Sequence, residues 1–145
     1  MKKFLTVLLV LVMLVSIICI ASAKVNLIMW TKEGEEALDW NKSLIEEFTK
    51  VNPNVTIELV KKTNVEILRE DFLTASLANA APDILWTVSD HAGPFVAADI
   101  IEPVDNLFDL NKYVGSAMDA VKLEGKYWGI PISNGNQLML LYNKK

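Results

Sequence analysis

The stretch Val25-Asn26-Leu27-Ile28-Met29-Trp30 is the first foldable segment of the chain, and it indicates the fold class. It is short and mostly apolar, as expected for a strand buried within a sheet. The polar and glycine residues from Lys32 to Gly34 interrupt this pattern. We therefore predict a buried strand over residues 25–30, with a loop directly after it.

The segment that follows the loop has the periodicity of a helix. From Glu35 onward, apolar side chains recur at three- and four-residue steps until Asn52-Pro53 ends the pattern. These positions are Ala37, Leu38, Leu44, Ile45, Phe48 and Val51. We predict an amphipathic helix over residues 35–51, with charged residues on its exposed face.

A second strand and helix, and then a third strand, come next. Apolar and polar residues alternate over residues 55–59, which predicts a strand. Thr63 and Glu66 have the spacing of a capping box, so we expect a helix to start there and to end before Pro82. Its apolar side comprises Val65, Leu68, Phe72, Ala75 and Leu77. We predict the third strand over residues 83–87.

The order of these elements is strand, helix, strand, helix, strand, which is typical of an α/β fold. Such an order predicts a parallel-rich sheet with helices on both faces. Ligands of these sheets bind beyond the carboxyl ends of the strands, which points to the loops at residues 30–35 and 87–93. Further on, we expect a short helix at 94–98, another at 113–121, a hairpin turning at Glu124-Gly125, and an apolar strand at 138–143.

Upstream of the first strand lies a segment typical of protein export. Lys2 and Lys3 precede an apolar run, and Ala21-Ser22-Ala23 matches the small-x-small cleavage pattern. We predict that residues 1–23 are a signal peptide and that the protein is periplasmic or extracellular. Two alternatives leave it membrane-associated: an uncleaved anchor, or lipid attachment at Cys19, for which the preceding Ile18 is a poor fit.

The composition of residues 24–145 excludes several classes of partner. Without Lys2 and Lys3, 12 basic residues remain from 14, against 18 acidic ones, so the formal net charge is −6. This argues against nucleic acid or an anionic membrane surface. With one histidine and no cysteine after residue 23, we expect no structural zinc and no cofactor.

Several segments together resemble the bacterial extracellular solute-binding proteins of family 1, which include the maltose-binding proteins. They occur in the family's order and at about its spacing. The segments are the first strand ending in Trp30, Pro82-Asp83-Ile84-Leu85-Trp86, Ile101-Glu102-Pro103, Gly125-Lys126-Tyr127-Trp128-Gly129-Ile130-Pro131 and Leu141-Tyr142-Asn143-Lys144. The resemblance covers the whole of residues 24–145.

This resemblance implies a type II periplasmic-binding-protein fold, in which two lobes close around a solute and present it to the permease subunits of an ABC transporter. Residues 24–130 would be the first lobe, and residues 131–145 would begin the crossover strand to a second lobe, which is absent. Either the sequence is a fragment or the product has one lobe. The implied function is binding of a sugar or another small solute, without catalysis.

The resemblance also implies which residues contact ligand. Asp90 and His91 match a carboxylate and a cation of the maltose-type members, although Asp90 could instead cap a short helix. Other candidates lie at the end of the first strand, in the loop after it and in the crossover segment. They are Trp30, Lys32, Glu33, Glu35, Asn134 and Asn136. The tryptophan could instead belong to the core and the asparagines to a turn, and the loop differs in length from that of the maltose-type members. Thr87 stands where those members carry a stacking tryptophan, and Trp86 is expected to point into the core.

Two rival functions belong to other classes. Asp90 and His91 could serve a small exported hydrolase as acid and base, although adjacent residues are a poor guide to catalytic geometry. A membrane-tethered sensory domain is the third possibility, and it requires the apolar N-terminal segment to be retained.

Overall fold

The computed structural model describes residues 23–133. Four sequence predictions lie outside these residues: the body of the signal peptide, the contacts of Asn134 and Asn136, and the strand at 138–143. Within the described part, no helix is long and apolar enough to cross a bilayer.

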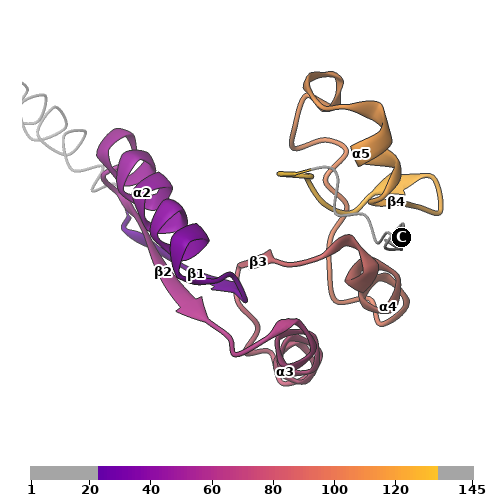
Figure 1. Cartoon of the computed structure of the whole chain (residues 1–145), viewed down its shortest axis with the longest axis horizontal. Coiled ribbons are helices and arrows are strands. Elements are labelled where there is room, and N and C mark those ends of the chain that lie inside the picture. The colour runs from indigo at the N-terminus through magenta and orange to yellow at the C-terminus, as the bar shows by residue number, and fades with distance from the viewer. Residues whose placement is uncertain (1–22, 134–145) are drawn as a thin grey trace, which may run out of the picture.

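A three-stranded parallel sheet forms the first half of the structure, as predicted. β1 (Val25–Thr31) lies in the middle, with β2 (Val55–Lys61) on one side and β3 (Ile84–Trp86) on the other. The register pairs Val25 with Val55 at one end and aligns Thr31 with both Lys61 and Trp86 at the other. The carboxyl ends of all three strands therefore lie at the same edge of the sheet (Figure 1).

The helix α2 (Glu35–Val51) has the predicted bounds and runs along the paired strands β1 and β2 (Figure 1). Of its predicted apolar side, Leu38 is buried, and Ala37 and Ile45 are half-buried. Three further members are exposed: Leu44, Phe48 and Val51. The sheet in the described residues is only three strands wide, so it covers a narrower strip of α2 than the periodicity predicts.

The helix α3 (Val65–Leu77) is capped by a different residue from the one predicted. The helix begins at Val65, so Asn64 occupies the cap, and its Oδ1 accepts a hydrogen bond of 2.9 Å from the backbone N–H of Ile67. The predicted capping box of Thr63 and Glu66 therefore places the cap one residue too early. The apolar side is confirmed at the buried Leu68 and Phe72, whereas Leu77 is exposed.

The second half of the structure consists of short elements. After β3 come the 3₁₀ turn η1 (Ser89–His91), α4 (Ala92–Ala97), the 3₁₀ turn η2 (Leu110–Lys112) and α5 (Gly115–Asp119). The predicted hairpin is formed by β4 (Lys122–Leu123) and β5 (Lys126–Tyr127). Glu124 and Gly125 both have positive φ, of 52° and 79°, which suits the right-handed twist of a two-residue hairpin.

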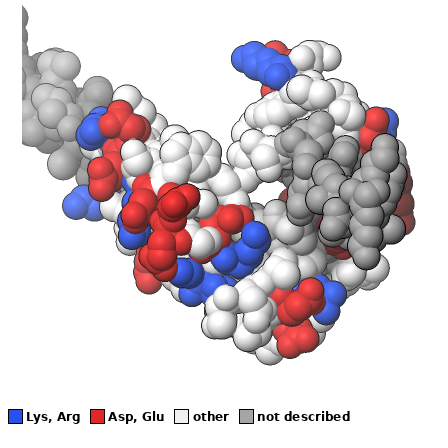
Figure 2. Space-filling model, viewed as in Figure 1, with Lys and Arg blue, Asp and Glu red and all other residues white. Residues whose placement is uncertain are grey.

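Aromatic packing joins the two halves. Phe72 of α3 and Phe95 of α4 have ring centroids 4.8 Å apart, and both side chains are buried. In Figure 1, α4, α5 and the hairpin lie on the far side of β3 from α2. Figure 2 shows a hollow between these two parts, with charged side chains of both signs along one side of it.

Candidate ligand-binding site

Two adjoining hollows open at the carboxyl ends of β1 and β3. The larger hollow has a volume of about 610 Å³, and the smaller hollow has a volume of about 550 Å³. Lys32, Val88 and Ser89 line both, so the two hollows lie next to each other. Their position agrees with the general rule for α/β sheets, which places ligands at this edge.

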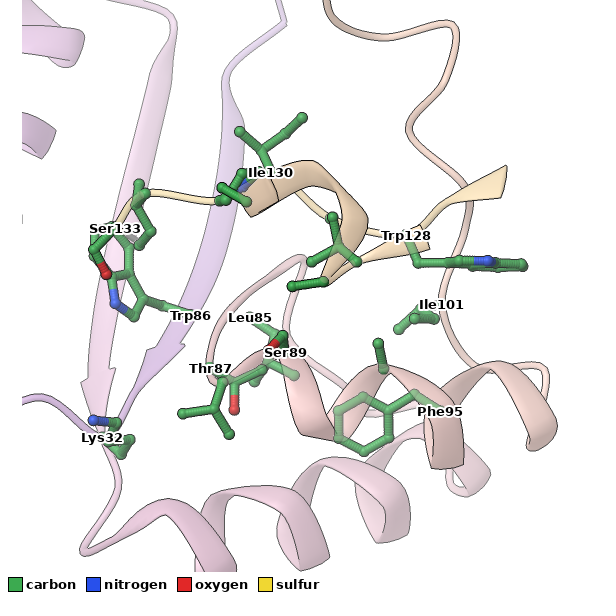
Figure 3. Close-up of a pocket in the computed structure, with 18 of the residues that line it drawn as sticks. Lys32, Leu85, Trp86, Thr87, Ser89, Phe95, Ile101, Trp128, Ile130 and Ser133 are labelled. Carbon is green, nitrogen blue, oxygen red and sulfur yellow. The ribbon is translucent and has the colours of Figure 1, made fainter. Parts of the chain in front are cut away.

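The larger hollow has an apolar wall and a polar rim (Figure 3). The wall comes from β3, α4 and the hairpin region and includes Leu85, Trp86, Phe95, Ile101, Trp128 and Ile130. The rim includes Lys32, Glu33, Thr87 and Ser89. Such a combination of apolar surface and a few polar groups is typical of small-molecule sites.

The smaller hollow is polar, and its charges are balanced. Lys32 and Arg69 contribute cations, while Glu66 and Asp90 contribute carboxylates. Arg69 pairs with Glu66 at 3.1 Å, and Lys32 pairs at 3.2 Å with Glu33 of the larger hollow's rim. Fixed donors and acceptors without net charge suit the hydroxyl groups of a neutral polyol.

The loop that carries Lys32 is held at its base by a buried threonine. Thr31, the last residue of β1, has no solvent exposure, and its Oγ1 accepts a hydrogen bond of 3.2 Å from the backbone N–H of Glu33. This contact ties the start of the loop to the end of the strand. It therefore positions Lys32 and Glu33 at the junction of the two hollows.

His91 is the buried titratable group of the site, with 4% of its surface exposed. Its Nδ1 lies 2.8 Å from the hydroxyl of Thr87, and its ring makes an edge-to-face contact with Phe95 at 5.7 Å. Burial lowers the pKa of His91 below 6.5, and the nearby Arg69 lowers it further, whereas Glu66 and Asp90 act in the opposite direction. The imidazole is therefore neutral at neutral pH.

This environment of His91 should make stability depend on pH. The pKa of His91 is 6.5 when unperturbed and lower in the folded chain, so below about pH 6.5 the unfolded chain binds the proton more readily. We expect stability to be lost as the pH falls from 7.5 to 5.5, with a slope of at most about 1.4 kcal/mol per pH unit. Urea unfolding of the wild type and of His91→Asn at several pH values measures this effect.

The sequence contains one histidine, so the variant removes the whole imidazole contribution to this pH dependence. His91→Asn should flatten the pH dependence. An equal slope in both proteins would show that His91 does not titrate differently on folding.

The structure brings together three of the predicted ligand residues. Lys32, Asp90 and His91 all line the smaller hollow, and Glu33 lines the larger one. Asp90 is exposed at this position, while His91 is held by Thr87.

Two other predicted residues lie away from both linings. The ring of Trp30 is covered by the ammonium group of Lys62, whose Nζ is 3.6 Å from the ring centroid and 2.9 Å from a carboxylate oxygen of Asp71. Glu35, the first residue of α2, pairs with Lys61 at the end of β2. Asn134 and Asn136 are outside the described residues.

Sequence reasoning missed the contribution of α3. Glu66 and Arg69 lie three residues apart on one face of α3, and both line the smaller hollow. A polar pair at this spacing is visible in the sequence, but it is equally typical of any exposed helix face. Only the position of α3 beside the segment 88–91 shows that the pair lines a hollow.

Trp86 also differs from the expectation that it points into the core. It is half-buried and lines the larger hollow (Figure 3). Its ring also meets that of Trp40 of α2 edge-to-face, with centroids 5.8 Å apart. Thr87 lines the same hollow although it is the next residue. The reason is that β3 ends at Trp86, so the alternation of a strand does not continue through Thr87.

Comparison with known proteins gives consistent results. The sequence pattern of the family described as bacterial extracellular solute-binding protein matches residues 43–145. A maltotriose-binding protein of Pyrococcus abyssi is 27% identical over 123 residues, which are 83% of this chain. Among solved structures, the Thermus thermophilus protein bound with maltotriose has a TM-score of 0.67 at 23% identity over 72% of this chain. CpMnBP1 with mannotriose bound has a TM-score of 0.68 at 28% identity over 74% of this chain.

These similarities extend over only part of the related proteins. The chain spans 26% of the Pyrococcus protein and 28% of each of the two solved chains. Within the matched part, the solved structures share the α/β arrangement of a type II periplasmic sugar-binding protein.

Proposed function

The chain belongs to the bacterial extracellular solute-binding proteins, and we propose that it is the first lobe of an exported protein that binds a neutral oligosaccharide. The smaller hollow carries this proposal. Its lining provides two cations, two carboxylates and a neutral imidazole, all placed at the carboxyl end of a parallel sheet. Related proteins are described as binding maltotriose or mannotriose, which supports a sugar as ligand.

Recognition would divide between polar and apolar surfaces. Hydroxyl groups of the sugar would bond to side chains of the smaller hollow, while the apolar wall of the larger hollow would pack against ring faces. In a two-lobed protein, ligand contacts with both lobes favour the closed state, and permease subunits of an ABC transporter would recognise that state. Delivery to a permease is part of this proposal.

The geometry does not favour the hydrolase alternative. A general acid or base pair requires its two groups to lie within hydrogen-bonding reach of each other or of a reacting atom. The hydrogen bond of His91 goes to Thr87 rather than to Asp90. A binding role uses the same residues without requiring proton transfer.

A thermal-unfolding panel tests the choice of ligand. If maltotriose binds with a dissociation constant of about 1 mM, then 20 mM sugar should stabilise the folded chain by about 2 kcal/mol and raise the melting temperature by several degrees. Spermidine at the same concentration should have no comparable effect. Asp90→Asn is the matched variant, since it keeps the size of an exposed side chain and removes one acceptor of the smaller hollow.

The sugar-dependent increment should shrink in Asp90→Asn while the melting temperature without sugar stays the same. Stabilisation by spermidine but not by maltotriose or mannotriose would reject a sugar in favour of a polyamine. Hydrolysis of the added oligosaccharide during the scan, detected by mass spectrometry, would restore the hydrolase interpretation.

A further inference from the structure

The contact between Thr87 and His91 fixes the imidazole before any ligand arrives. The Thr87 hydroxyl lies 2.8 Å from Nδ1, and Phe95 supports the ring from the side. His91 lines the smaller hollow and its Nδ1 contacts Thr87, which leaves Nε2 as the ring nitrogen available to a ligand there. Resting on the proposed function, we propose that Thr87 is a positioning residue that makes His91 present Nε2–H as a hydrogen-bond donor to the sugar.

The hydrogen-bonding capacity of the two groups indicates which of them donates the hydrogen bond. Within residues 23–133, Nδ1 of His91 is the one partner that the Thr87 hydroxyl has. If Nδ1 carried the proton, the half-buried hydroxyl would have to accept it, and its own hydrogen would have no acceptor among the described protein residues. A hydroxyl that donates to Nδ1 uses its hydrogen within the protein and keeps its oxygen lone pairs for the larger hollow, which Thr87 also lines. We therefore assign the hydroxyl as the donor to Nδ1, so that the neutral ring carries its proton on Nε2.

The charged groups around the ring are consistent with this arrangement. On α3, Arg69 disfavours a second proton on His91, while Glu66 favours one; Asp90, in η1 with His91, also favours one. Lys32, from the loop after β1, adds a further cation to the same hollow. The hydrogen bond that the Thr87 hydroxyl donates stabilises the unprotonated Nδ1, and so it favours the neutral ring.

Nuclear magnetic resonance can test the proposal directly, because the sequence has a single histidine. The ¹⁵N-labelled chain, purified after export, is recorded in long-range ¹H–¹⁵N spectra between pH 5 and 8. We expect one dominant tautomer at pH 7.5, with the proton on Nε2. Thr87→Val removes the hydroxyl at constant shape, and it should give a mixture of tautomers and raise the pKa of His91 toward its ordinary value.

Thr87→Ser is the matched control, since it keeps the hydroxyl. It should preserve the wild-type tautomer and pKa, which a role of Thr87 in packing alone would not predict. A proton on Nδ1 in the wild type would overturn the proposal. So would an unchanged tautomer and pKa in Thr87→Val.

Addition of maltotriose at tens of millimolar separates this inference from the proposed function. We expect the Nε2 signal to shift, and we expect Thr87→Val to weaken the affinity by about 2- to 10-fold while Thr87→Ser retains it. Shifts at Lys32 and Ser89 without any change at Nε2 would overturn the inference but leave the proposed function standing. If no signal of the chain shifts, both fail.

Discussion

Replacing Leu68 by alanine should lower the free energy of unfolding by about 2–5 kcal/mol, the range measured for Leu→Ala changes in well-packed cores. Leu68 lies in α3 and has no solvent exposure. Its helix also carries Phe72, which packs against Phe95 and so holds α4 in place. Small domains are stabilised by only about 5–15 kcal/mol, so the loss should be severe. Urea unfolding followed by tryptophan fluorescence measures it.

Leu77→Ala, at the end of the same helix, is the matched control. Leu77 is 73% exposed, so the same chemical change should cost about 0.5 kcal/mol or less. Equal losses in the two variants would mean that α3 does not pack as described.

The sheet and its two helices could be predicted from the sequence because their signals are local. The apolar run of β1 and the steps of α2 gave these elements nearly their observed bounds. The order of elements predicted parallel pairing, which the register of β1 with β2 and β3 confirms. The cap of α3 was wrong by one residue because Thr63, Asn64 and Glu66 all have side chains suited to a helix start.

The proximity of some candidate site residues could be predicted where topology alone determines it. Lys32 and Asp90 follow strands whose carboxyl ends must share one edge, so their proximity follows from the parallel order. The prediction that Trp30 contacts ligand could not be settled from topology. Trp30 lies next to the end of β1, but the ammonium group of Lys62 covers its ring, and a contact from the residue that follows the neighbouring strand β2 depends on tertiary packing.

Arg69 and Thr87 illustrate the same limit. The place of Arg69 in the hollow depends on how α3 lies beside the segment 88–91, which periodicity does not encode. Thr87 was judged by its position relative to a stacking tryptophan in the resembling family, whereas the structure gives it a hydrogen bond to His91. The exposed Leu44, Phe48 and Val51 likewise follow from the width of the sheet rather than from the helix itself.

Binding of sugar by this chain should be weak compared with that of a two-lobed protein. A micromolar site corresponds to a binding free energy of about 8 kcal/mol, and half of it corresponds to a dissociation constant of about 1 mM. A lobe that supplies half of the contacts should therefore bind roughly 1,000-fold more weakly than a closed pair of lobes. The conformational closure that excludes water would also be missing.

A residue-resolved titration of the ¹⁵N-labelled chain with maltotriose tests the central claim most directly. We predict saturable shifts with a dissociation constant of about 1 mM. They should be largest for the amides around the smaller hollow, at Lys32, Ser89 and Asp90. Micromolar affinity would contradict a site shared between two lobes. Shifts confined to residues outside both hollows, or no shifts at all, would contradict a sugar site at this edge of the sheet.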